Sequence, residues 1–114
     1  MNGVNGVILL PDDWNTSIYA LNYTNRGDAP FTTNTIATAD WETMESAGAV
    51  FLPPVGLRDG TSVYYVGSGG GYWSSSYYLS YFAYVVDFGS DNLGTSRIYD
   101  RYYGLSVRLV RDAE

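Results

Sequence analysis

Residues 72–88 read YWSSSYYLSYFAYVVDF, and the second half of this stretch alternates in the way a half-buried strand does. The alternation predicts a strand over residues 82–88, with three side chains on one face: Tyr84, Val86 and Phe88. The opposite face is expected to carry Ala83, Val85 and Asp87. Because Val86 and Phe88 are apolar, we place them in the core, where truncation would cost a few kcal/mol, on the order of other core deletions.

The segment around this strand is rich in tyrosine. Residues 72–103 carry eight of the twelve tyrosines, mixed with Ser, Gly, Asp and Asn. Tyr gives a large rigid ring and one polar group at low entropic cost, which is why adaptable recognition surfaces use this mixture. The alternative is that rings such as Tyr72 and Tyr84 fill the core or pair across strands. As a set the tyrosines are too dense for a core of this size, so we favour a binding face.

Composition bounds the function. A chain of 114 residues makes one domain, and its net charge of −6 with six Arg and no Lys argues against nucleic acid as a partner. The absence of Cys and His removes thiolate nucleophiles, imidazole bases and Cys/His zinc sites. The apolar run at residues 7–10 is far too short to span a membrane.

Upstream, residues 7–10 predict a buried strand that ends at Pro11, and residues 12–35 predict a long loop without sustained periodicity. Four apolar side chains are expected to hold this loop on the core: Trp14, Ile18, Tyr19 and Leu21. The start MNGVNGVILL lacks the basic and long apolar regions of a secretory signal, and we expect a longer parent chain.

One short amphipathic helix is predicted over residues 39–47. Thr38 or Asp40 would be its N-cap, and Gly48 is placed to terminate it in the left-handed conformation. The core-facing stripe would consist of Trp41, Met44 and Ala47.

The rest of the chain predicts strands and turns. Residues 50–52 form a strand stopped by two prolines, and the Asp59-Gly60 turn leads into a strand over residues 61–66. Residues 67–71 are glycine-rich and are expected to form a flexible connector, because the Lys and helix of a phosphate-binding loop are missing. A final half-buried strand is expected from the alternation of Leu105, Val107 and Leu109.

The carboxylates suggest two alternative sites, a glycosidase site and a calcium site. Asp12 and Asp13 could act on a glycoside, which needs two carboxyls roughly 5–10 Å apart, but directly after Pro11 they more simply form a turn. The acidic residues of the helix complement its dipole. A calcium site would draw its oxygens from Asp87, Asp91, Asn92 and Asp100. The Glu-Pro-Asn and Trp-Asn-Asp motifs of calcium-dependent lectins are absent, and we expect no cofactor.

Four motifs occur in order: NGVILLPDDW at residues 5–14, ATADWETMESAGAVFLP at 37–53, YWSSS at 72–76 and RYYGLSVRLV at 101–110. Together they resemble the C-type-lectin-fold variable domains of gut Bacteroides proteins. That group is similar to the Fibrobacter succinogenes major paralogous domain, and many members are targets of diversity-generating retroelements. The resemblance implies that residues 1–114 form one α+β domain of C-type-lectin-like fold, the C-terminal part of a longer protein. It would contain mostly antiparallel strands and irregular loops with one short helix.

In such systems a template repeat is copied with errors at adenines, so Glu, Met and Trp cannot arise at the diversified codons. Residues 77–105 contain none of the three. The resemblance implies framework positions at Ser80, Ala83, Val86, Phe88, Ser90, Leu93, Thr95, Arg101, Gly104, Ser106, Val107 and Arg108. The diversified, ligand-binding positions would be Tyr77, Tyr78, Leu79, Tyr81, Phe82, Val85, Asp87, Gly89, Asp91, Gly94, Arg97, Ile98, Tyr99, Asp100, Tyr102, Tyr103 and Leu105.

The sequence therefore predicts a non-catalytic domain that displays a hypervariable Tyr/Ser/Asp-rich surface to an unknown protein or glycan. Two alternatives stay open. One is a glycan-binding lectin of fixed specificity. The other is a structural subunit of a surface assembly, whose aromatic face packs on a preceding segment or a sister subunit as a homo-oligomer. No membrane insertion is expected, and the resemblance implies a location at the bacterial cell surface or outside the cell.

Overall fold

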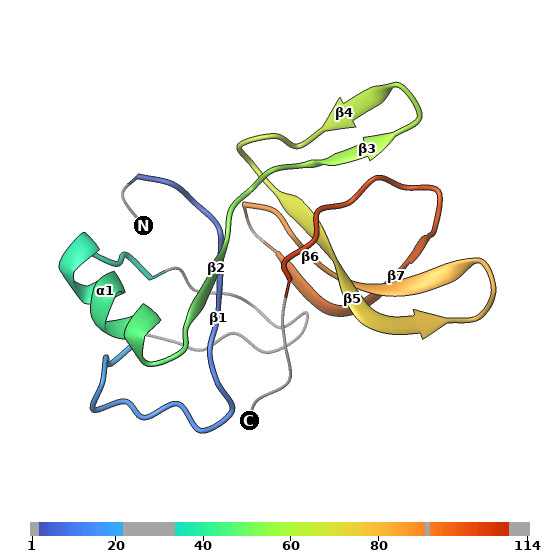
Figure 1. Ribbon diagram of the computed structural model, residues 1–114. Coiled ribbons are helices and arrows are strands. Elements are labelled where there is room, and N and C mark those ends of the chain that lie inside the picture. The colour runs from blue at the N-terminus through green and yellow to red at the C-terminus, as the bar shows by residue number, and fades with distance from the viewer. Residues whose placement is uncertain (1–2, 22–33, 91, 110–114) are drawn as a thin grey trace.

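The computed structural model describes residues 3–21, 34–90 and 92–109. The described elements run in the order β1 (Val7–Leu9), α1 (Thr38–Ser46), β2 (Val50–Leu52), β3 (Leu57–Asp59), β4 (Ser62–Tyr64), β5 (Gly70–Tyr78), β6 (Phe82–Phe88) and β7 (Leu93–Asp100). All the strand pairs between these elements are antiparallel, and they form the small sheets β1-β2, β3-β4 and β5-β6-β7 (Figure 1). The predicted α+β class, mostly antiparallel strands with one short helix, is confirmed.

The N-terminal half packs helix α1 against the β1-β2 pair. Val7 lies opposite Leu52 and Leu9 opposite Val50 in the ladder. Met44, which is fully buried on the inner face of α1, forms the centre of the first core cluster with Ile36 and Ala49. Half-buried apolar side chains surround them: Ile8, Leu10, Trp14, Tyr19, Leu21 and Trp41. The predicted anchoring of the loop by Trp14, Tyr19 and Leu21 is confirmed, while Ile18 is half-buried outside this cluster.

The two ends of α1 differ in how well the sequence predicted them. The N-cap is Ala37 without a side-chain cap, so the assignment of Thr38 or Asp40 was wrong. The C-terminus ends as predicted, because Gly48 takes φ +99° and its N–H donates to the Glu45 carbonyl at 2.9 Å. The Ala49 N–H donates to the Met44 carbonyl at 3.0 Å, which completes a Schellman motif and buries the residue after the turn.

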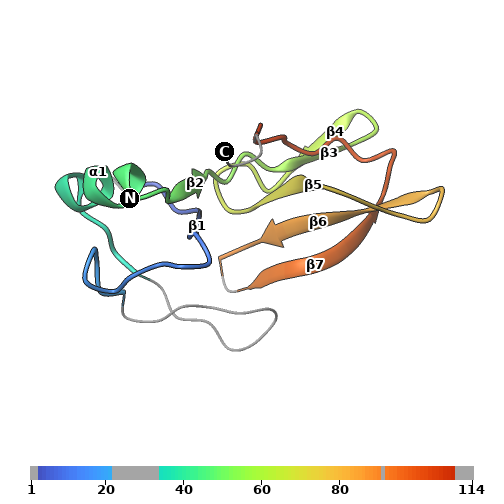
Figure 2. The same ribbon diagram turned by 60° about the horizontal axis from the view of Figure 1, so that its bottom comes forward.

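The β5-β6-β7 sheet forms the other half, and β6 is its central strand. In Figures 1 and 2, α1 and the turn between β5 and β6 lie at opposite ends of the molecule. Trp73 pairs with Val85, and Tyr77 pairs with Ala83. Between these two pairs the chain advances four residues in β5 but only two in β6, which makes a bulge in β5. A smaller irregularity interrupts the β6-β7 ladder between Val85 and Asp87. These bulges bend and twist the sheet towards its free end.

A second core cluster joins the halves. It consists of Leu52, Tyr72 and Phe88, with Tyr72 and Phe88 stacked at 6.4 Å between ring centroids. The Tyr72 hydroxyl donates a hydrogen bond of 2.8 Å to the Pro53 carbonyl. Burial raises the pKa of this hydroxyl, which is therefore neutral and a donor at every physiological pH. Strand β5 is thus fixed to the end of β2 by packing and by a hydrogen bond.

The predicted flexible connector at residues 67–71 is wrong in its second half. Gly70 and Gly71 are buried members of β5, since a Cβ at either residue would crowd the Phe88 ring or Leu105 at 3.2–3.3 Å. Glycine at these positions permits a close approach of backbone and side chains. By composition alone, such a glycine-rich strand resembles a loop.

The predicted final strand is also wrong. Only isolated bridges form, from Gly104 to Arg58 and from Ser106 to Tyr72. Leu105 is half-buried, but Val107 and Leu109 are 63% and 88% exposed, because the segment leaves β5 after its two hydrogen bonds at Ser106. Strand β7 was not predicted, although it supplies the third strand of the sheet.

The β3-β4 hairpin projects from the sheet and turns at Gly60, which has φ +59°. The predicted turn at Asp59-Gly60 is confirmed, but the strand after it is shorter than predicted. All three residues of β4 are exposed, as are Tyr65 and Val66 after it.

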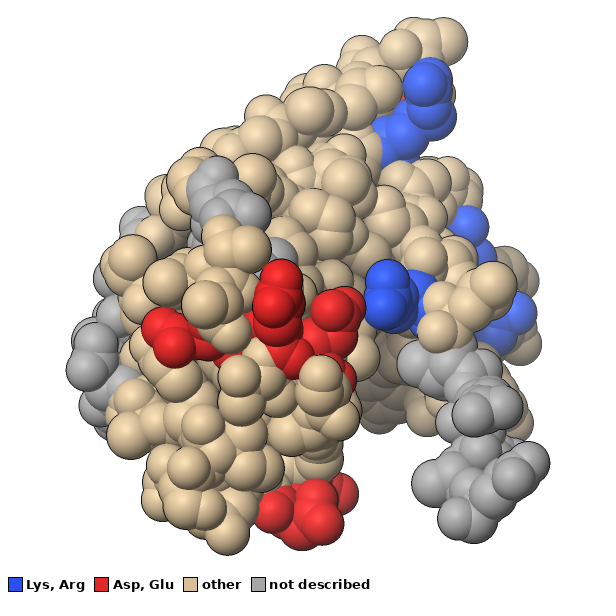
Figure 3. Space-filling model, turned by 60° about the vertical axis from the view of Figure 1, so that its left-hand side comes forward, with Lys and Arg blue, Asp and Glu red and all other residues tan. Residues whose placement is uncertain are grey.

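Charge is divided between the halves of the described chain. Residues 3–21 and 34–53 hold five carboxylates and no arginine, whereas residues 54–90 and 92–109 hold four arginines and three aspartates. Figure 3 shows red and blue groups on separate parts of one face. Among the described residues, the excess of carboxylates therefore lies in the half that contains α1.

Candidate functional site

Large side chains crowd the free end of the β5-β6-β7 sheet. We call residues 77–82 and 98–103 the aromatic end. Its most exposed members lie in three neighbouring segments: the end of β5, the turn between β5 and β6, and the residues after β7. The exposed fractions are 76% for Tyr77 in β5, 60% for Leu79 and 76% for Tyr81 in the turn, and 69% for Tyr102 after β7. Ile98 and Tyr78 add 43% and 38%. An exposed cluster of this kind is typical of an interaction surface.

Arg101 holds the turn of the aromatic end in place. Its Nε donates to the Phe82 carbonyl and its Nη2 to the Leu79 carbonyl, each at 3.2 Å. The backbone N–H of Arg101 donates to the Tyr81 carbonyl at 2.9 Å. Leu79 takes φ +54°, a conformation that these bonds compensate. This contact set agrees with the structural role expected of Arg101.

Tyrosine rings also support one another. Tyr103 contacts Tyr102 at 4.7 Å and Tyr99 at 5.5 Å between ring centroids, and Tyr78 contacts Tyr84 at 5.4 Å. A side-chain hydrogen bond with Tyr103 raises the pKa of the exposed Tyr102 hydroxyl to about 12. The rings are therefore held against each other.

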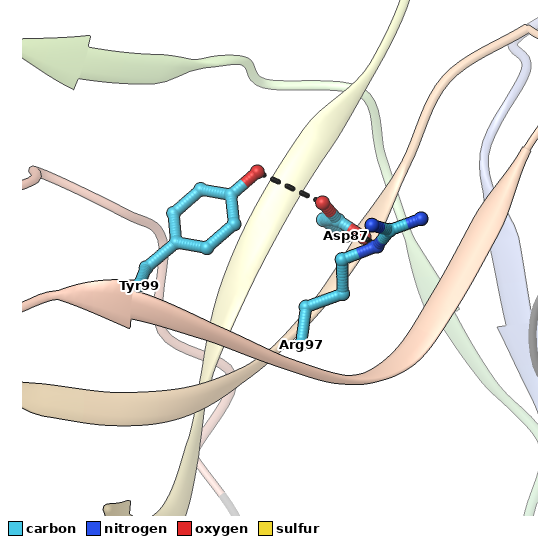
Figure 4. A network of polar contacts seen from close by, with 3 residues as sticks. All are labelled: Asp87, Arg97 and Tyr99. Carbon is cyan, nitrogen blue, oxygen red and sulfur yellow. Dashed lines mark hydrogen bonds and ion pairs between the residues drawn. The ribbon is translucent and has the colours of Figure 1, made fainter.

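Asp87 links two strands of the sheet (Figure 4). Its Oδ2 accepts a hydrogen bond of 2.8 Å from the Tyr99 hydroxyl, and its Oδ1 lies 3.3 Å from Arg97 Nε. Burial, and next the hydrogen bond to Asp87, raise the pKa of Tyr99 to about 12. Gly94 makes room for this contact, since a Cβ there would collide with Asp87 Oδ1 and lie 2.5 Å from Arg97 Nε. These four positions form one packed unit.

An open pocket lies beside the turn, on the β5 side. Its volume is about 230 Å³, and its lining consists of Trp73, Ser74, Ser75, Ser76, Tyr77, Ala83 and Arg101. The pocket occurs where β5 bulges, because the two extra residues between Trp73 and Tyr77 move the serines out of the ladder. Such a pocket is smaller than a drug-sized site and suits one small group.

The residues predicted to bind a ligand are placed unevenly. Those exposed in the structure are Tyr77, Tyr78, Leu79, Tyr81, Arg97, Ile98 and Tyr102. Those that are half-buried are Phe82, Asp87, Gly89, Tyr99, Asp100, Tyr103 and Leu105. Val85 and Gly94 are buried, and Asp91 lies outside the described residues. In this conformation Val85, at 1% exposure, has no surface to offer a ligand, because β6 is central and buries a residue on each face.

The pocket contains residues that the sequence did not single out. Trp73 was noted only as part of the YWSSS motif and is half-buried, and Arg101 was expected only as a framework residue. Within the strand bulge, Ser74 Oγ accepts a hydrogen bond of 3.1 Å from the backbone N–H of Ser76. In the sequence, the run of three serines after Trp73 was the feature that could have indicated this pocket.

Of the described residues named for the rival calcium and glycosidase sites, Asp100 alone belongs to the aromatic end. Asp87 is committed to Tyr99 and Arg97, and no group of three or more Asp or Glu residues suited to a metal occurs within the described ranges. Asp12 and Asp13 are exposed in the other half. None of the helices in the described part of the chain is long and apolar enough to cross a membrane.

Fold and site together define a small α+β domain whose three-stranded sheet ends in an exposed aromatic surface. A family model matches residues 15–110, and the chain belongs to that family, a domain of unknown function (DUF8237). No curated protein and no solved structure matches the chain. The description of the family states no activity, so the residues of the site carry the functional conclusion.

Proposed function

We propose that this protein is a non-catalytic ligand-binding domain whose aromatic end contacts a protein or glycan partner. The observation that carries the proposal is the exposure of Tyr77, Tyr81 and Tyr102 from three neighbouring segments. Burying an aromatic side chain is worth about 1.5–3 kcal/mol, so a few such anchors supply useful affinity.

The support around these rings favours binding over chemistry. Arg101 fixes the turn, and Asp87 fixes Tyr99 and Arg97, so the surface is preorganised. The chain contains no His or Cys, and the serines have no adjacent base to activate them.

We further propose a C-type-lectin-like scaffold, diversified by a retroelement, at the bacterial surface or outside the cell. The sequence motifs support this, together with the mixture of a bonded framework and exposed neighbours. In β7, for example, the framework residue Leu93 is half-buried, while the diversified positions Arg97 and Ile98 are exposed. Diversification would concentrate on positions such as Tyr77 and Tyr81.

The test is to sequence the DNA beside the gene. We expect a near-copy of the segment encoding residues 72–108 that differs only at adenines, next to a reverse transcriptase gene. The differing codons should encode the exposed members of the aromatic end. If a near-copy differs equally at all four bases, or none exists, the diversified display is refuted and a fixed ligand remains.

A second candidate is a subunit of a surface assembly. The β3-β4 hairpin favours it, because Val63, Tyr64, Tyr65 and Val66 are 46–68% exposed on one projecting element. Sedimentation velocity of the purified protein tests this candidate. Association that weakens on Tyr65→Ser but not on Tyr81→Ser would favour assembly, whereas a monomer at all concentrations would exclude self-assembly.

A further inference from the structure

We infer that the pocket at the β5 bulge is a calcium-independent subsite for an acidic sugar ring, such as a uronic acid, within a larger ligand. The inference rests on the proposed binding function and names a ligand class for part of the same surface. It depends on Trp73, the serines 74–76, Tyr77 and Arg101, which line the pocket together.

Arg101 is the cation of the pocket, and it is held in place by hydrogen bonds while some of its N–H donors remain unused. A guanidinium carries five N–H donors. Arg101 uses one on the Phe82 carbonyl and one on the Leu79 carbonyl, which fixes its plane. Its other donors have no acceptor among the described residues. No Asp or Glu lines the pocket, so a ligand carboxylate would be the partner that the lining lacks.

The hydroxyls favour a sugar over a simple acidic side chain. Ser74 Oγ bonds to the backbone of Ser76, whereas the hydroxyls of Ser75 and Ser76 have no protein partner within the described ranges. A serine hydroxyl both donates and accepts, as sugar hydroxyls do. A glutamate side chain would use the guanidinium but leave these two groups without a complement.

The aromatic walls fit a ring-shaped ligand. Tyr77 is 76% exposed, and the Arg101 guanidinium lies over its ring at 6.0 Å from the centroid. The half-buried Trp73 also lines the pocket. A pyranose presents C–H groups on its face, which pack on such rings while its hydroxyls reach polar groups at the edge. A pocket of about 230 Å³ has room for one sugar ring, and because it is open, the rest of a larger ligand can extend beyond it.

The experiment is an NMR titration of the ¹⁵N-labelled protein with methyl glucuronide, following the three tryptophan indole resonances. We expect saturable shifts of the Trp73 resonance in the millimolar range without calcium, while Trp14 and Trp41 in the other half do not respond. The neutral methyl glucoside should bind at least about five-fold more weakly, as loss of one charged hydrogen-bonded contact implies.

Two substitutions locate the site. Ser75→Asp places a carboxylate in the pocket without touching the Arg101 bonds, and should abolish the shifts while the unfolding temperature is unchanged. Its matched control is Ser62→Asp on the exposed strand β4. Arg101→Gln should weaken binding, whereas Arg58→Gln, the same charge change outside the pocket, should not.

Three results would overturn the inference. Equal shifts with methyl glucoside, or unchanged binding by Ser75→Asp, would show that the carboxylate is not recognised there. Shifts with the amide of N-acetylglutamate and none with methyl glucuronide would assign the pocket to an acidic peptide instead. The DNA test of the proposed function is independent, so a template repeat without glucuronide binding refutes this subsite alone.

Discussion

Val85→Ala is the sharpest test of how the sheet is built. The sequence pattern places Val85 among the ligand contacts and Val86 in the framework, but in the structure Val85 is 1% exposed and Val86 is half-buried. If the structure is right, Val85 contributes more to stability than its neighbour.

The size of the effect follows from the atoms removed. Val85→Ala deletes two buried carbons, worth about 0.8 kcal/mol each in transfer free energy. The cavity adds roughly 1 kcal/mol if the surroundings do not collapse, giving a total loss of about 2–3 kcal/mol. Val86→Ala removes the same atoms from a partly hydrated site and should cost about 1 kcal/mol.

Urea unfolding followed by tryptophan fluorescence measures both free energies of unfolding. Equal slopes for the two variants and the wild type would show that the comparison is valid. The exposed Leu79→Ala is the control and should change stability by less than about 0.5 kcal/mol. A loss at Val85 no larger than that at Val86 would refute the assignment of Val85 to the core.

Three further predictions concern the site. Asp87→Asn should lower the Tyr99 pKa from about 12 towards its ordinary value while burial keeps it somewhat raised, which ultraviolet absorbance titration measures, with no change expected at Tyr72. Because the folded-state pKa of Tyr99 is raised, its stabilising contribution is complete below pH 10 and is lost as pH rises towards 12. Urea unfolding across this window should show that loss in the wild type and a smaller one in Asp87→Asn. Gly94→Ala should cost about 1–3 kcal/mol by overpacking against Asp87, whereas Gly60→Ala should cost about 1 kcal/mol from φ alone; equal losses in thermal unfolding would contradict the close packing. Replacing Tyr77, Tyr81 and Tyr102 together by Ser should leave the unfolding free energy within about 1.5 kcal/mol of wild type; a larger loss would show that these rings are structural.

Local patterns predicted much of the fold. Strand β6 matches residues 82–88, and Gly48 ends α1, because alternation and a left-handed glycine are encoded in neighbouring residues. Gly70 and Gly71 were predicted to form a connector because the residues next to them in the sequence do not show that Phe88 and Leu105 pack against them. Those two side chains come from distant segments. Strand β7 is polar on much of its surface and owes its conformation to pairing with β6.

The exposed cluster of tyrosines was predicted in outline. Tyrosine density located the aromatic end, since exposed Tyr77, Tyr81 and Tyr102 all come from the dense segment. Which residues point outwards depends on ladder register, and two bulges shift that register in a way that alternation cannot anticipate. The pocket was missed for the same reason, because the displaced serines arise from the mismatch between Trp73–Tyr77 and Ala83–Val85.

The separation of charge between the two halves gives the described chain an electric dipole along the line from α1 to the sheet. In the field of an anionic surface, such a molecule turns its carboxylate-rich helix away and presents the sheet first. The effect acts over about 8 Å at physiological ionic strength, so it orients the molecule just before contact. Collisions with any anionic surface would therefore be biased towards those in which the sheet leads.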